Sequence, residues 1–335
     1  WSNLVWSNVG NFLSVPTDCP QRNERMGWSG DISVFSRTAT YVSNVEAFLA
    51  RHMRAMRDVQ SDAGRFTDIA PVGGGFGGVL WGSAGLTVPW EVYQQYGDRR
   101  LLEEHYPAMA AYVAHLETTK GEDGLSSDST LGDWLGPQNE KLGSDFLVTA
   151  YHVYDLWIMA KTAEILDRED DALKYRRMHD ARRRFFNERF VNADQKTVGI
   201  AGRRPSFGGR PGAPGEWKVA DTQSSYAVGL ALGAFSDESR PAMERRLAAA
   251  VERESVDDGG VTRPPHSLMT GLVSLVAVRD RPGSDHDLGT PERLHDRGRI
   301  RRQQQHELVQ PLLVRRRRAV DDGVLPRDRA GRAGL

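Results

Sequence analysis

The spacing of apolar residues along this chain predicts helices rather than strands. In the segment that follows Asp31, apolar side chains recur at steps of three and four, which places them on one face of a helix. This face comprises Val42, Val45, Phe48, Leu49, Met53, Met56 and Val59. Asp31 precedes the segment and could serve as the N-cap of the helix.

The same periodicity predicts further helices over residues 100–119, 147–166, 171–190, 222–235 and 240–254. Segments with the alternating pattern of strands are scarce, and the connecting segments are rich in glycine and aromatic residues. We therefore expect an all-α array of long helices whose loops carry the chemistry.

The segment VPTDCPQRNERMGWSGD, residues 15–31, has no regular periodicity and permits two interpretations. In the first it is a capped helical turn, with Asp18 as N-cap and Pro20 in the first turn. Gln21 would then complete a capping box and Gly27 would end the turn. Judged on spacing alone, this structural interpretation is slightly favoured.

In the second interpretation the same segment is a sugar site, which uses the residues that the capped turn leaves unexplained. These are Arg22, Glu24, Arg25, Trp28 and Asp31. Several carboxylates beside an aromatic surface are typical of proteins that bind and cleave glycosides. That reaction needs a protonated carboxyl group on one side of the bond and a second carboxylate opposite it.

Two glycine-containing loops are further candidates for a site. GGGFGG at 73–78 matches the dinucleotide fingerprint formally, but it lacks the strand–turn–helix context, which favours a flexible loop. LGDWLG at 131–136 places Asp133 and Trp134 on a loop between helices. It is either a turn with a buried Trp or a second carboxylate–aromatic pair that faces the same pocket as Glu24.

Composition excludes several functions. The 335 residues carry a net charge of −1, so no whole-chain field favours nucleic acid or an anionic membrane. We expect no membrane span, since no apolar run is long enough. One cysteine and nine histidines show no metal-ligand spacing, so we expect no metal and no cofactor. The chain starts with Trp1, and we interpret this start as the interior of a longer protein.

Taken together, the motifs resemble those of the bacterial α-L-rhamnosidases of glycoside hydrolase family 78. Residues 18–31 resemble the family pattern DCPQRDERLGWTGD, and the resemblance continues in order through VFSRTATY, VPWEVYQQYGD, LGDWL and DTQSSYAVGLALG. It covers roughly residues 1–271 and implies a six-hairpin (α/α)6 barrel, incomplete at both ends. It also implies inverting release of terminal α-L-rhamnose from a glycoside or polysaccharide.

The resemblance also implies residue roles. Glu24 corresponds to the general acid, and the residues implied to bind the sugar are Asp18, Arg22, Trp28, Asp31, Asp133 and Trp134. Crowded carboxylates should raise the pKa of Glu24 and keep it protonated. The chain departs from the family at Asn23 and Ser83, where the family often has Asp.

The family's general base, the Glu of a late TIWERW motif, is absent from this chain. Residues 276–335 instead contain fourteen arginines and no lysine, and no aromatic residue follows Phe235. Read one base later, codons for residues 285–293 permit Thr-Met-Ile-Trp-Glu-Arg. We therefore predict a catalytic fragment at 1–271 and an out-of-frame tail at 272–335, disordered or poorly packed, with hydrolysis impaired.

Two rival hypotheses stay open. The chain could be a non-catalytic carbohydrate-binding or interaction protein, with Arg315 to Arg318 in a genuine basic arm. Polyanion binding that salt weakens and that deletion of residues 272–335 abolishes would favour this rival. The chain could also be another (α/α)6 glycosidase, related to trehalases or glucoamylases. Only the motif at 18–31 separates the two enzyme classes, and it favours rhamnose.

Sequencing the gene across codons 265–335 tests the frameshift. We expect an extra or a missing base near codons 272–275, after which the corrected frame encodes Trp-Glu-Arg and Asn-His-Tyr. DNA that confirms the chain as written, without those codons in any frame, would contradict the hypothesis and leave the basic arm in need of its own function.

Overall fold

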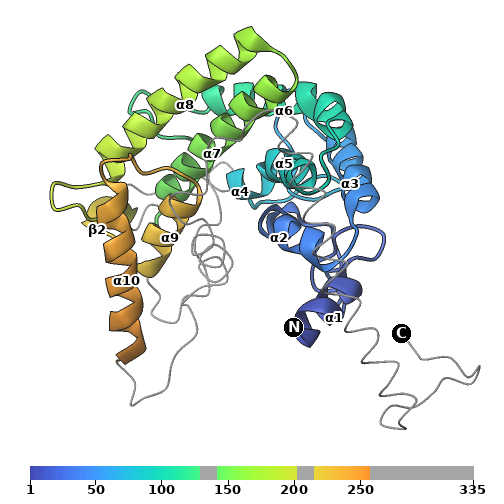
Figure 1. Ribbon diagram of the computed structural model, residues 1–335, viewed down its shortest axis with the longest axis horizontal. Coiled ribbons are helices and arrows are strands. Elements are labelled where there is room, and N and C mark those ends of the chain that lie inside the picture. Colours follow the sequence, from blue (N-terminus) through green and yellow to red (C-terminus); the bar gives the residue numbers. More distant parts are fainter. Residues whose placement is uncertain (129–141, 202–214, 257–335) are drawn as a thin grey trace, which may run out of the picture. The chain divides into compact units, whose positions relative to one another are not determined.

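The computed structural model describes residues 1–128, 142–201 and 215–256 (Figure 1). Nearly all of the described residues belong to one compact unit, which takes in Trp1–Tyr93 and the described residues from Asp98 to Val256. The tail predicted at 272–335 lies outside the described residues, as do Asp133 and Trp134.

Helices form most of the described chain, which confirms the all-α prediction. They are α1 (Ser2–Asn11), α2 (Ser29–Val42), α3 (Glu46–Asp58), α4 (Val79–Gly82), α5 (Ala84–Tyr96), α6 (Arg100–Thr118), α7 (Ser144–Ile165), α8 (Glu169–Phe190), α9 (Gln223–Ala231) and α10 (Arg240–Val256). Within the described ranges, no helix combines the length and apolarity needed to cross a membrane.

The first predicted helix is in fact two. Helix α2 ends at Val42 and α3 begins at Glu46, because Ser43 takes an extended conformation and its N–H bonds back to the carbonyl of Ala39. The predicted apolar face is correct within α3, where Leu49, Met53 and Met56 are buried. The N-cap prediction for Asp31 is wrong, since this residue lies inside the first turn of α2.

Most residues of helix α7 are buried, including the polar Asp145, His152 and Asp155. Only one stripe, which contains Trp157 and Lys161, is partly exposed, so the predicted amphipathic helix is present with a narrow solvent face. Helix α8 packs along α7 (Figure 1) and turns Tyr175, Phe186 and Phe190 inward. The exposed side of α8 carries most of its charged residues. The two helices thus form an antiparallel pair, the unit from which a six-hairpin fold is built.

Among the described residues, one antiparallel pair of short strands interrupts the helices. Strands β1 (Val198–Ala201) and β2 (Glu216–Val219) pair antiparallel, with Val198 opposite Val219. All four residues of β2 are exposed, so the strand has no alternation of buried and exposed positions from which it could have been predicted.

Four phenylalanines form the centre of the core around α7 and α8. The ring of Phe146 lies 4.9 Å from that of Phe186 and 5.5 Å from that of Phe190, both in edge-to-face geometry. Phe235, after α9, packs edge-to-face on Phe186 at 5.7 Å. Such pairs add to the free energy of burial, so this cluster ties α9 to the α7–α8 pair.

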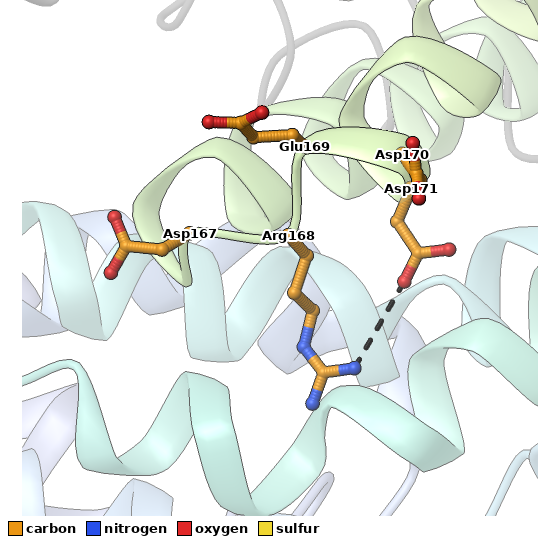
Figure 2. Close-up of a pocket in the computed structure, with 5 residues that line it drawn as sticks. All are labelled: Asp167, Arg168, Glu169, Asp170 and Asp171. Atoms are coloured by element: carbon orange, nitrogen blue, oxygen red, sulfur yellow. Dashed lines mark ion pairs between the residues drawn. The ribbon is translucent and has the colours of Figure 1, made fainter.

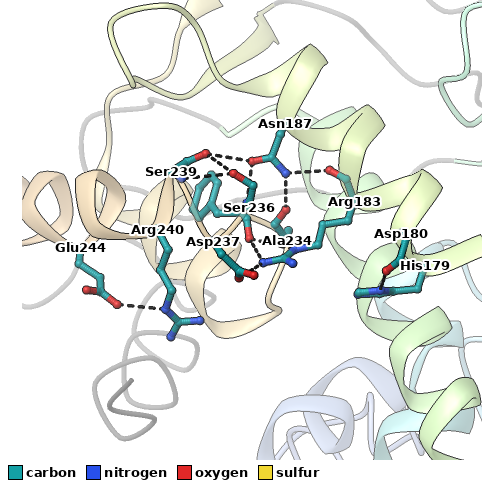
Figure 3. A network of polar contacts seen from close by, with 11 residues as sticks. His179, Asp180, Arg183, Asn187, Ala234, Ser236, Asp237, Ser239, Arg240 and Glu244 are labelled. Atoms are coloured by element: carbon teal, nitrogen blue, oxygen red, sulfur yellow. Dashed lines mark hydrogen bonds and ion pairs between the residues drawn. The ribbon is translucent and has the colours of Figure 1, made fainter. Parts of the chain in front are cut away.

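A polar network reinforces the same junction (Figure 3). The amide of Asn187 on α8 donates to the carbonyl of Ala234 at 2.9 Å and accepts from the N–H of Ser236 at 2.8 Å. Arg183, one turn earlier, donates to the carbonyl of Phe235 at 3.0 Å and to the carboxylate of Asp237 at 2.8 Å. The turn between α9 and α10 is therefore anchored on α8.

Phe186→Ala should lower the free energy of unfolding by about 3–5 kcal/mol, because it leaves a cavity among three aromatic rings. Urea denaturation followed by circular dichroism measures this change. Leu173→Ala, on the same helix but 46% exposed, serves as the control and should change stability by less than about 0.5 kcal/mol. Equal effects of the two substitutions would contradict the assigned core.

Candidate functional site

Residues 18–26 form a closed loop rather than a helical turn. The N–H of Asp18 donates to the carbonyl of Met26 at 3.0 Å, and the N–H of Met26 donates to Oδ1 of Asp18 at 2.8 Å. The capped-turn interpretation is therefore wrong. Asp18 closes the loop across its neck instead of capping a helix.

The loop between these two residues is conformationally strained. Cys19 and Arg25 take left-handed conformations with φ of 24° and 44°, which residues with a Cβ rarely adopt. Strain of this kind is typical of functional loops, where it aims particular side chains. Here the two strained positions flank the turn that carries Arg22 and Glu24.

A second segment, residues 68–70, holds the end of the loop in place. Trp28 forms an antiparallel bridge with Ile69, and the N–H of Ser29 donates to the carbonyl of Asp68 at 2.8 Å. The N–H of Ala70 donates to the carbonyl of Gly27 at 3.0 Å. A Cβ on Gly27 would lie 2.1 Å from the carbonyl oxygen of Ala70, so no other residue fits there.

Asp18 is the buried member of the carboxylate group, with 8% of its surface exposed. Burial raises its pKa to about 6, although the Met26 N–H acts in the opposite direction. The neighbouring carboxyls of Glu24 and Asp31 raise the pKa further. Asp18 is thus the carboxyl group that retains a proton at mildly acidic pH.

Glu24 differs from the expectation, because its pKa is lowered rather than raised. The main cause is a side-chain hydrogen bond from Asp18, and the ion pair with the Arg22 guanidinium adds to it. The expected effect of crowded carboxylates is real, but it falls on Asp18, because Asp18 is buried and Glu24 has a cation beside it. A proton in this pair is therefore favoured on Asp18 rather than on Glu24.

Asp31 and Trp28 lie beside this pair. The pKa of Asp31 is raised by desolvation and by the charge of Glu24, although the residue is exposed by surface area. The indole N–H of Trp28 is buried, helps to lower the pKa of Glu24, and has no acceptor in strict hydrogen-bonding geometry among the described residues. A donor of this kind can bind a ligand oxygen at little cost.

The described residues contain one group that could present three ligands to a metal, the side chains of Asp18, Cys19 and Glu24, whose ligand atoms all lie within 4.8 Å of one another. The Arg22 guanidinium already neutralises Glu24 in this group. A cation would have to compete with that ion pair, so the arrangement favours a neutral polar ligand over a metal ion.

A surface hollow at the start of α8 is lined by residues that do not belong to the candidate site at 18–31 (Figure 2). Its lining comprises Asp167, Arg168, Glu169, Asp170 and Asp171. The carboxylates suit the positive end of the α8 dipole, and Arg168 stacks 4.4 Å from the ring of Tyr106. Tyr106 also donates to Asp171 at 2.8 Å, so these groups are explained by helix capping and packing.

Sequence reasoning missed the residues that support the site loop. The carboxylate of Asp68 is buried, accepts from the N–H of Gly77 at 2.9 Å and pairs with Arg65 at 3.2 Å. The sequence did contain a signal for this contact. Asp68 shortly precedes the glycines at 73–78, and a carboxylate in that position can accept hydrogen bonds from their N–H groups. Glycine-rich composition alone suggested only flexibility.

Comparison with known proteins places this geometry in a family context. Residues 1–263 match the family described as the bacterial alpha-L-rhamnosidase 6 hairpin glycosidase domain, which confirms the expected fold. A curated alpha-L-rhamnosidase of Streptomyces avermitilis is 39% identical over 254 residues, which are 75% of this chain and 22% of the relative. One from Formosa agariphila is 32% identical over 255 residues, 73% of this chain and 25% of the relative.

A solved structure of a relative has the same fold as this chain. The crystal structure of the Streptomyces avermitilis alpha-L-rhamnosidase complexed with L-rhamnose superimposes with a TM-score of 0.65 at 32% identity. The match covers 89% of this chain and 27% of that one. The present chain therefore spans about a quarter of the length of the relatives that it matches.

Asp18→Asn removes the group that titrates near pH 6 while keeping an acceptor for Met26. A carboxyl whose pKa rises from 3.8 to about 6 on folding stabilises the protein when protonated, and this contribution is lost as pH rises through that window. Wild type should therefore lose stability relative to Asp18→Asn between about pH 4 and pH 6.5, as measured by urea denaturation. A pH-independent difference would contradict the raised pKa.

Proposed function

Since the chain belongs to the bacterial α-L-rhamnosidase six-hairpin glycosidase family, we propose that it binds terminal α-L-rhamnosyl groups and carries the acid half of an inverting hydrolysis. The observation that supports this most directly is the close grouping of the Asp18 and Glu24 carboxyls, whose oxygens lie within 4.8 Å of each other in the loop. The Streptomyces avermitilis relative was crystallised as a complex with L-rhamnose, and we extend that ligand class to this chain.

In this proposal Glu24 protonates the glycosidic oxygen of the leaving group. Its side chain is 34% exposed, so it can reach a bound substrate, whereas Asp18 lies behind it. Asp18 retains the proton in the free protein and bonds to Glu24. A sugar that covers the loop would displace water from Glu24, and this desolvation favours its protonated form.

The remaining residues of the loop would hold the sugar. Asp31 and the indole N–H of Trp28 offer an acceptor and a donor next to Glu24, which suits a ring that carries several hydroxyl groups. Arg22, whose side chain is 61% exposed, is the movable partner of Glu24. Asp133 and Trp134 are proposed to line the same pocket on the strength of the sequence resemblance.

Inversion also needs a base that activates water on the opposite side of the sugar. We infer that the translated chain lacks this glutamate, because the TIWERW motif is absent from the sequence. Binding without efficient hydrolysis is the expected result, and it would place this polypeptide functionally close to a carbohydrate-binding protein.

Calorimetric titration with L-rhamnose, alongside a hydrolysis assay on an aryl α-L-rhamnoside, tests the proposal. We expect wild type to bind the sugar and to hydrolyse the glycoside close to the uncatalysed rate. Asp31→Asn should weaken binding by about tenfold or more, as expected for the loss of a charged hydrogen-bond acceptor.

Asp194→Asn is the matched control, since Asp194 is an exposed carboxylate in the turn after α8, and it should leave binding unchanged. Wild type that shows no rhamnose binding would contradict the proposed function. Inverting hydrolysis well above background would instead contradict only the missing base.

A further inference from the structure

The loop GGGFGG, residues 73–78, has a defined backbone conformation. At most of its positions this conformation favours glycine over all other residues. Gly73, Gly74, Gly75 and Gly78 have φ of 80°, 81°, 111° and 86°, all in the left-handed region. Residues with a Cβ are strained there. Four such positions in six residues restrict this loop to glycine for a geometric reason.

Contacts of the loop explain that geometry. Asp68 binds it twice, accepting from the N–H of Gly77 at 2.9 Å and donating its own N–H to the carbonyl of Gly74 at 2.9 Å. A Cβ on Gly75 would lie 2.5 Å from Cβ of Asp68, and one on Gly77 would lie 2.2 Å from the indole of Trp81. The loop is therefore pressed against Asp68 and Trp81.

Phe76 is the one residue of this loop with a side chain, and it points away from the core. It is 55% exposed, and its ring meets that of Trp28 edge-to-face, with centroids 5.2 Å apart and planes at 70°. Two further apolar side chains are exposed on the adjoining segments, Val72 at 73% and Met26 at 42%. An exposed aromatic ring that contacts a residue of a polar site offers a surface for the apolar part of a ligand.

The position of Trp28 connects this apolar surface to the proposed acid. Trp28 contacts the ring of Phe76 on one hand and, on the other, lies near enough to Glu24 for its indole N–H to help lower the pKa of that carboxyl group. An acid must reach the oxygen that joins rhamnose to the leaving group, so the leaving group passes close to Glu24. The carboxylates of Asp18 and Asp31 suit the hydroxyl-rich sugar, whereas an apolar ring suits a flat apolar aglycone.

We propose that Phe76, held out by the glycine loop, is a specificity residue that stacks on an aromatic aglycone of the rhamnoside. This inference rests on the proposed function and adds to it a residue that selects among leaving groups. Phe76 acts on binding of the leaving group and takes no part in proton transfer.

The test compares the dissociation constants of phenyl and methyl α-L-rhamnoside, measured by calorimetry at low temperature, where hydrolysis is slowest. Wild type should bind the phenyl glycoside about five-fold more tightly, which corresponds to one favourable aromatic contact. Phe76→Ala should remove this preference and leave the affinity for the methyl glycoside within about two-fold of wild type. Phe76→Trp should retain the preference.

Leu173→Ala is the control for loss of an exposed apolar side chain elsewhere, and it should change neither constant. A phenyl preference that persists in Phe76→Ala, or a wild type with no preference, overturns the role of Phe76 and leaves the proposed function standing. Wild type that binds neither glycoside overturns both. If Phe76→Ala lost affinity for both glycosides equally, the specificity role would be overturned, and the residue would instead be shown to support the sugar site.

Discussion

Asp68 contacts both segments on which the candidate site depends, the glycine loop through its buried carboxyl group and the start of α2 through its backbone carbonyl. Its side chain pairs with Arg65 and accepts from Gly77, while its backbone carbonyl accepts from the N–H and the hydroxyl of Ser29 at 2.8 and 2.9 Å. A buried carboxylate is costly unless its oxygens are paired, so these partners are held to their positions. The start of α2, and with it Asp31, is located by the same residue that shapes the glycine loop.

The helices were largely predictable because each has an apolar face with a helical period. The predictions for α6, α7 and α8 agree with the structure to within a few residues. The apolar spacing did not reveal the break between α2 and α3, because it continues across residues 43–45. The available signal was Asn44, whose Oδ1 accepts from the N–H of Glu46 at 3.3 Å. A helix end that depends on the conformation of a single serine leaves no trace in periodicity.

The composition of the site was predictable from its motif, but its electrostatics were not. The motif placed Asp18, Glu24 and Asp31 together and predicted that their mutual repulsion would raise the pKa of Glu24. The structure makes Asp18 buried and gives Glu24 a cation, Arg22, so the proton resides on the first carboxyl rather than the second. Burial and the direction of an arginine side chain are three-dimensional properties that spacing along the chain does not contain.

The glycine loop separates the part of the site that must stay constant from the part that can vary. Its backbone is determined by Asp68, Trp81 and the glycines, none of which depends on the side chain at position 76. A change of that one codon would alter the surface offered to a ligand without disturbing the loop that presents it. The arrangement suits gradual diversification, in which related enzymes come to accept different leaving groups by single substitutions, and it makes position 76 a natural site for a focused mutant library.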